Sequence, residues 1–162
     1  MAALQDDGRI GECALFISLP LFFAWGRGNP AWDVTPEPEP TNATGLVDEV
    51  GRRIATQAQF VKPDPAGEIE LPGGQRFIPS ATPTKWAHVR VVFDYLDAAG
   101  ETLREVGLFY GTETDPALPP GQRYFTPAQV VAPGRLKVLE RLNTPLIREA
   151  GVRQTFEYVL PF

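Results

Sequence analysis

The chain has 162 residues, which suits a single domain with an extended arm, and its 43% hydrophobic and 22% charged residues are ordinary for a globular protein. A net charge of −5 without a Lys/Arg stripe argues against nucleic-acid binding, because the chain repels phosphate backbones. The 17 prolines and 15 glycines indicate many turns between short strands.

An apolar run extends from Cys13 to Trp25. It is too short to cross a bilayer, and Pro20 interrupts it, so we expect no membrane insertion. The charged residues before it are mostly acidic, which argues against a signal peptide. The run is therefore predicted to be a β segment, buried in its own domain or covered by a partner. A lone cysteine forms no intramolecular disulfide and usually packs as a small hydrophobe.

A segment rich in glycine and proline follows, Gly26–Pro40. Its Pro36–Pro40 end is predicted to be extended, and a polyproline helix of five residues reaches about 15 Å. Leu46, Val50 and Ile54 recur at a spacing of four, which predicts a short helix near 45–56. We assign 1–59 to an N-terminal region with an apolar segment, a proline-rich arm and this helix.

The clearest strand pattern runs over 86–96, where apolar residues and His88, Arg90 and Asp94 alternate. A turn at 97–100 and a returning strand over 103–110 predict a hairpin. We assign 60–162 to an antiparallel β domain that contains this hairpin. Its other predicted elements are a loop at 115–123, a short helical turn at 126–129, and strands at 135–142 and 152–162. The predicted fold is mainly β, an antiparallel sandwich-like domain with one or two short helices.

Few residues are equipped for chemistry. His88 is the single histidine and stands on the polar face of a strand, so we expect a hydrogen-bonded or exposed side chain there. Glu37 and Glu39 are more typical of a solvated acidic linker than of a cation site. No phosphate-binding glycine motif or nucleophile elbow occurs. We predict no cofactor, no metal and no enzyme activity; a glycosidase pair such as Asp94 and Asp97 is the enzymatic alternative.

Large aromatic residues occur in unusual places. Phe22, Phe23, Trp25 and Trp32 lie close together, just before or within the segment rich in glycine and proline. Aromatic residues are enriched at protein–protein hot spots, so these four are candidate interface residues. The other interpretation is that they cap the domain's own core.

The segment Glu101–Phe109 (ETLREVGLF) resembles a stretch of bacteriophage tail proteins, namely tail-collar fibre N-terminal domains and baseplate wedge proteins. The segment Trp25–Asp33 with the following Pro-x-Pro-x-Pro, and the closing residues 152–159, are similar to the opening and the last strand of such proteins. Arg104 and Glu105 lie on opposite faces of the predicted strand and join the candidate interface residues.

This resemblance implies a virion protein without catalytic activity, present in several copies per particle and held by neighbouring tail, baseplate or fibre proteins. It implies residence in the virion tail and in the host cytoplasm during assembly. The alternative function is a β-sandwich module that binds a carbohydrate or a receptor.

Overall fold

The computed structural model describes the whole chain, Met1–Phe162, whose residues form two compact units. The first unit contains Met1–Leu19, Ala55–Val91 and Thr155–Phe162, and the second contains Pro20–Ile54 and Val92–Gln154. The chain therefore enters each unit more than once. The predicted division into 1–59 and 60–162 stays a prediction, since these units group the residues in another way.

The α-helix α1 (Asp6–Ser18) belongs to the first unit and buries Cys13 and Phe16. Residues Cys13–Ser18 were predicted as β structure, and this prediction is wrong for them. The inward residues of α1 recur three residues apart, as on one face of a helix. Burial raises the pKa of the Cys13 thiol to about 11, and the ring of Phe16 lies 5.3 Å from that of Phe162. No helix of the protein is both long enough and apolar enough to cross a bilayer.

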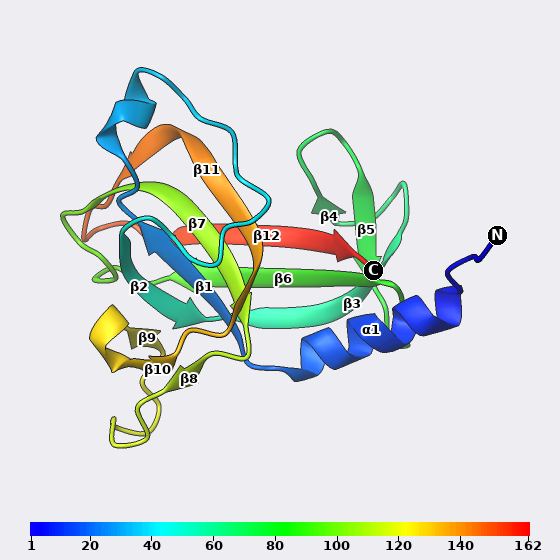
Figure 1. The fold of residues 1–162 in the computed structure, drawn as a ribbon. Helices are drawn as coiled ribbons and strands as arrows, with labels where there is room; N and C mark the ends of the chain where they lie inside the picture. The colour runs from blue at the N-terminus through cyan, green and yellow to red at the C-terminus, as the bar shows by residue number, and fades with distance from the viewer. The chain divides into compact units, whose positions relative to one another are not determined.

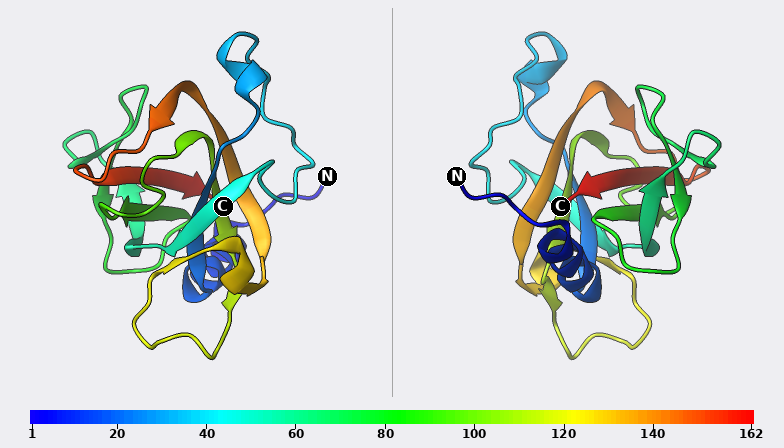
Figure 2. Two further views of the ribbon diagram at one scale, coloured as in Figure 1. Left: turned by 90° about the vertical axis from the view of Figure 1, so that its left-hand side faces the viewer. Right: turned by 90° about the vertical axis from the view of Figure 1, so that its right-hand side faces the viewer.

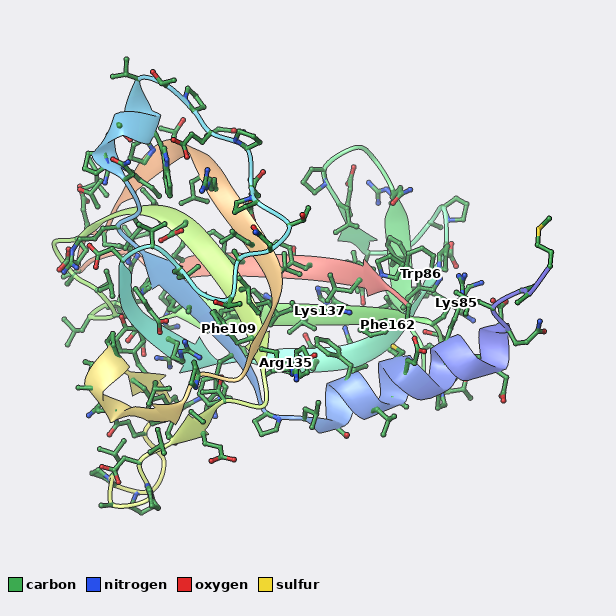
Figure 3. All side chains as sticks on the ribbon, in the orientation of Figure 1. Lys85, Trp86, Phe109, Arg135, Lys137 and Phe162 are labelled. Atoms are coloured by element: carbon green, nitrogen blue, oxygen red, sulfur yellow. The ribbon has the colours of Figure 1, made fainter.

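The sheet that dominates the first unit is antiparallel, with the strand order β12-β6-β3-β5-β4 (Figure 1). Its strands are β3 (Gln57–Pro63), β4 (Ile69–Glu70), β5 (Arg76–Pro79), β6 (Trp86–Phe93) and β12 (Gln154–Pro161). The C-terminus is tied down beside β6, because the Phe162 amide donates to the Lys85 carbonyl at 2.9 Å. Lys85, Trp86 and Phe162 lie together there in Figure 3.

The second unit is built on an antiparallel sheet with the order β11-β7-β1-β2-β9. Its strands are β1 (Leu21–Gly26), β2 (Glu49–Ile54), β7 (Thr102–Tyr110), β9 (Tyr124–Phe125) and β11 (Arg135–Ile147). A second, two-stranded sheet pairs β8 (Glu113–Thr114) with β10 (Val130–Ala132), and two 3-10 turns are η1 (Pro30–Asp33) and η2 (Pro127–Gln129). Figure 2 shows η1 and the segment after it projecting beyond the ends of these strands.

The core of the second unit centres on β1, all six residues of which are buried. The rings of Trp25 and Phe93 stack with centroids 3.5 Å apart. The Trp25 indole Nε1–H donates to the Tyr124 hydroxyl at 3.0 Å, and burial raises the pKa of Tyr124 to about 12. A strand buried on both faces must pair on both edges, and β1 does so with β2 and β7.

Two further predictions are wrong. The helix expected near 45–56 is the strand β2; its marker residues were spaced by four, an even number that also fits the two-residue period of a strand. The strands predicted at 86–96 and 103–110 exist as β6 and β7, but they belong to different sheets and form no hairpin.

The fold class is confirmed as mainly β with antiparallel sheets and little helix. Alternation in β6 is confirmed too, since Ala87, Val89 and Val91 are fully buried. The strand predicted from Arg135 is β11, the C-terminal strand is β12 at the edge of its sheet, and η2 is the short turn expected at 126–129.

Candidate functional site

Two of the segments that carry the family resemblance, Trp25–Asp33 and Glu101–Phe109, meet in the second unit. The strands β1 and β7 are paired so that Gly26 stands opposite Glu105 and Trp25 opposite Val106. This register brings the residues after β1 to the start of β7. The sequence separates the two segments by more than 65 positions, and the sheet places them side by side.

Arg104 joins these segments through a bidentate ion pair. Its Nε donates to Asp33 Oδ1 at 2.7 Å and its Nη2 to Asp33 Oδ2 at 2.8 Å. Its Nη1 donates to the Arg27 carbonyl at 3.0 Å. The guanidinium holds the pKa of Asp33 below its usual value, and the carboxylate raises the pKa of Arg104. Arg104 thereby fixes both ends of the segment Arg27–Asp33, which contains η1.

Arg27 makes a second bidentate pair beside the first. Its Nε and Nη2 each donate to a Glu101 carboxylate oxygen at 2.7 Å, and its Nη1 donates to Asp48 Oδ1 at 3.2 Å. Hydrogen bonding to Arg27 lowers the pKa of Glu101. The loop after β1 is thus held to the turn before β7 and to the residues before β2.

Glu105 points the other way and is only 1% exposed. Its Oε1 accepts the backbone N–H of Val47 at 2.7 Å and that of Asp48 at 3.2 Å. Gly26 leaves the room for this carboxylate, since a Cβ there would lie 2.7 Å from Oε1. Burial raises the pKa of Glu105 above its ordinary value, against the opposing effect of the two backbone donors.

Trp32 packs between Gly28 and Arg141. The Arg141 guanidinium carbon stands 4.0 Å from the centre of its ring, and a Cβ on Gly28 would come within 2.4 Å of the ring. Gly28 has a φ of +60°, which favours glycine. Asn29 Oδ1 accepts the Ala31 N–H at 3.0 Å and so caps the η1 turn that positions Trp32.

The proline-rich arm lies against β11 through Arg141. The Arg141 amide donates to Glu39 Oε1 at 2.9 Å, and its Nη1 donates to the Pro38 carbonyl at 3.0 Å and to Glu37 Oε2 at 3.2 Å. The backbone donor of Arg141 lowers the pKa of Glu39. The two glutamates are exposed, as expected for a solvated linker, and both bind the same arginine.

The predicted interface residues fall into two groups. Phe22, Phe23 and Trp25 are at most 5% exposed, so they fill the core, the second interpretation that the sequence left open. Trp32 is half-buried in the cluster described above, together with Arg104 and Glu105. Contact of these three with a partner stays a prediction.

Sequence reasoning missed Arg27, Asp33, Glu101 and Arg141 as functional residues. The first three lie inside the segments that carry the resemblance. Opposite charges in these two segments were the available signal, because they could have been matched as ion pairs between the segments. Nothing in the sequence marks Arg141, because its role depends on the position of β11.

The single histidine lies in the first unit and is almost fully buried. His88 Nε2 lies 2.9 Å from Glu157 Oε2, and its Nδ1 lies 3.2 Å from Gln59 Nε2. Both ring nitrogens therefore have partners, as expected for a hydrogen-bonded strand residue. No group of three or more His, Cys, Asp and Glu side chains is arranged to hold a metal ion.

Comparison with known proteins identifies a family for the chain. Residues 1–162, the whole chain, match the family model described as "Baseplate wedge 3 tail fiber network component". No curated protein matches the chain. The match confirms the resemblance to baseplate wedge proteins that Glu101–Phe109 and Trp25–Asp33 carry.

Proposed function

We propose, from the premise that the chain belongs to the family of baseplate wedge 3 tail fiber network components, that it is a non-catalytic adaptor of a phage tail. A structural role in the tail, in contact with other tail proteins, follows from the family. The finer proposal is that the loop Arg27–Pro40, with Trp32 at its centre, is the part that contacts a neighbouring protein.

The proposal is based on one observation: the loop has no apolar core of its own, yet arginine side chains hold it in a defined position. Arg104 and Arg27 hold its beginning with bidentate pairs, and Arg141 holds its end. A loop that is already ordered loses less conformational entropy when a partner binds. The side chain of Val34, which is 87% exposed, extends from this loop into solvent. Such a preordered, partly apolar loop suits docking.

The charged residues of the cluster also fit a structural role. Arg27, Arg104 and Arg141 each bind a carboxylate within the same unit. A nucleophile or a general base needs a free group near its substrate. These groups serve instead to hold backbone segments together, so the proposal contains no reaction.

The test is incorporation of variants into tails. Tails are assembled in cells that supply only Trp32→Ala or the matched control Glu113→Ala, an exposed residue of β8. We expect Trp32→Ala to lower the amount of the chain per purified tail, while both isolated proteins still unfold cooperatively. Equal amounts of the two variants in tails contradict the role of this loop, and a wild-type chain missing from tails contradicts the adaptor function itself.

The carbohydrate-binding alternative finds no aromatic platform in the hollow of the first unit. The polar hollow of the first unit is lined by Gln57, Gln59, Glu68, Ile69, Glu70, Pro79, His88, Arg90 and Glu157, none of which offers a Trp, Tyr or Phe ring. A glycan array separates the two functions, because an adaptor shows no selective binding to any sugar. Selective binding by the wild-type chain favours the carbohydrate module.

A further inference from the structure

The segment Pro36–Pro40 of the proposed docking loop is stiff although it belongs to no helix or strand. Its sequence, Pro-Glu-Pro-Glu-Pro, alternates proline with glutamate. A proline ring fixes its own φ at about −65°, and the residue before a proline is kept out of the α-helical region. Each residue of the segment is therefore restricted either by its own ring or by the ring that follows it. The alternation favours an extended rod of the polyproline II kind, which has little conformational entropy to lose.

The segment is open to solvent along its whole length. Every residue of Pro36–Pro40 is exposed, and Arg141 supplies the hydrogen bonds that hold the segment against β11. A polyproline II chain has three residues per turn, so rings that are two residues apart point in three different directions. Contact with β11 on one side cannot cover all three rings. Proline surface therefore stays available to another molecule.

Proline surface of this kind is recognised by aromatic rings. Extended proline-rich segments dock in grooves lined with aromatic side chains, and their preformed conformation keeps the entropic cost of binding low. Within the loop, the ring of Trp32 is already engaged, because the Arg141 guanidinium lies 4.0 Å from its centre and Gly28 packs against it. The aromatic rings that bind the segment therefore have to come from the partner.

The charges of the docking loop define the rest of the partner's surface. Its three guanidinium groups, those of Arg27, Arg104 and Arg141, are outnumbered by the carboxylates bound around them, which are Asp33, Glu37, Glu39, Asp48 and Glu101. The Glu37 side chain is 58% exposed although it is paired, so its carboxylate can accept a further donor. Lysine or arginine complements this excess of negative charge, whereas an acidic surface is repelled.

We infer that the segment Pro36–Pro40 is a ligand, which a neighbouring tail protein binds in a groove lined with aromatic rings and carrying a lysine or arginine beside them. The inference rests on the proposed adaptor function and names the chemistry of the partner. A second copy of this chain fits poorly, because each copy carries a net charge of −5 and the same excess of carboxylates in this loop.

The first test is cross-linking in assembled tails. Thr41 is exposed and directly follows the segment, so a Thr41→p-benzoylphenylalanine variant places a photoreactive group there and keeps every proline and glutamate. Irradiated tails are digested, and the linked peptides are identified by mass spectrometry. We expect the links to converge on one region of another tail protein that contains aromatic residues together with lysine or arginine, and replacement of those aromatic residues by alanine to release the chain.

Three results of this test overturn the inference. They are links to a region without aromatic or basic residues, links only to this chain or to a second copy, and no links in tails that contain the variant. Full retention of the chain after the linked aromatic residues are replaced by alanine has the same consequence.

The second test removes one proline ring. Pro38→Ala deletes about two methylene groups of contact and loosens the backbone, so retention in tails during washing should fall about fivefold to tenfold. Pro116→Ala is the matched control, since it changes an exposed proline in another loop of the same unit, and it should be retained like the wild type. Both isolated variants should unfold at the wild-type midpoint. Equal retention of the two variants overturns the inference.

The third test removes one charge and keeps the fold of the loop. Glu39 Oε1 accepts the Arg141 amide at 2.9 Å, and the amide oxygen of Glu39→Gln can accept the same N–H group. Retention of Glu39→Gln should fall about threefold at low salt and match the wild type at high salt, because exposed ion pairs are weak and screened. The control Glu113→Gln, at an exposed residue of β8, should match the wild type throughout. Equal or stronger retention of Glu39→Gln at low salt contradicts a basic partner surface.

These tests separate the inference from the adaptor function. If the wild-type chain is absent from purified tails, the adaptor function fails and the segment has no tail partner. If the wild-type chain is present and Trp32→Ala reduces incorporation while Pro38→Ala and Glu39→Gln do not, the docking loop stands. Only the assignment of Pro36–Pro40 as the bound segment then fails.

Discussion

Replacement of Glu105 by alanine provides the sharpest test of how the site is built. The carboxylate is buried and accepts two backbone N–H groups, those of Val47 and Asp48. Losing these bonds costs about 1 kcal/mol each, at the low end because Val47 is 63% exposed and water can reach its amide. The one methylene group that is removed adds about 0.8 kcal/mol. Relief of the buried charge offsets part of this, so we expect a loss of about 2 kcal/mol in the free energy of unfolding.

The assay is urea unfolding followed by tryptophan fluorescence. A Trp86→Phe background leaves only Trp25 and Trp32, both in the second unit, to report on the change. Hydrogen exchange should also show faster exchange of the Val47 and Asp48 amides in Glu105→Ala. The control is Glu113→Ala, which changes an exposed glutamate and should shift stability by less than about 0.5 kcal/mol. If Glu105→Ala matches this control and both amides stay protected, the reasoning is refuted.

Two further predictions concern the same region, and a third concerns the helix α1 of the first unit. Because burial raises the folded-state pKa of Glu105, protonation of this carboxyl favours the folded state. This pH-dependent contribution to stability is complete below the unfolded pKa of about 4.3 and is lost as pH rises through the folded pKa. Glu105→Gln should therefore compare better with the wild type in urea melts at pH 7 than at pH 4. Gly28→Ala should destabilise the second unit by about 1–2 kcal/mol, because φ is +60° and the new Cβ meets Trp32. Gly8→Ala, at an open helical position, should raise the melting temperature.

The sequence predicted individual strands better than their partners. Alternation of apolar and polar residues located β6 and β12, because the two-residue period is a local property of the backbone. The strand β7 was predicted as the strand that returns after the turn at 97–100. The pairing of β7 with β1 is not local, since it depends on β1 needing a neighbour on each edge. A short turn at 97–100 looked sufficient for a hairpin, yet the two strands it joins entered different sheets.

The site was predicted in part for the same reason. Arg104 and Glu105 were found because they stand in one recognisable segment, and their opposite directions follow from strand geometry. Their partners Asp33 and Val47 are 71 and 58 positions away, and only the register between β1 and β7 brings them close. Arg141 was out of reach of sequence reasoning, because an edge strand had to be placed before its contacts with Trp32 and Glu39 were visible.

The use of arginine in this loop follows from its composition. The segment Gly26–Pro40 has too few apolar side chains to fold by burial, so ion pairs to Arg104, Arg27 and Arg141 hold it in place. Ion pairs in contact with water are individually weak, which means that the loop is ordered only when they act together. In the proposed docking, a partner that covers these pairs lowers the local dielectric constant and strengthens the attraction within each pair, against the cost of removing water from the charges. Because these pairs already order the loop, the partner binds it with little further loss of conformational entropy.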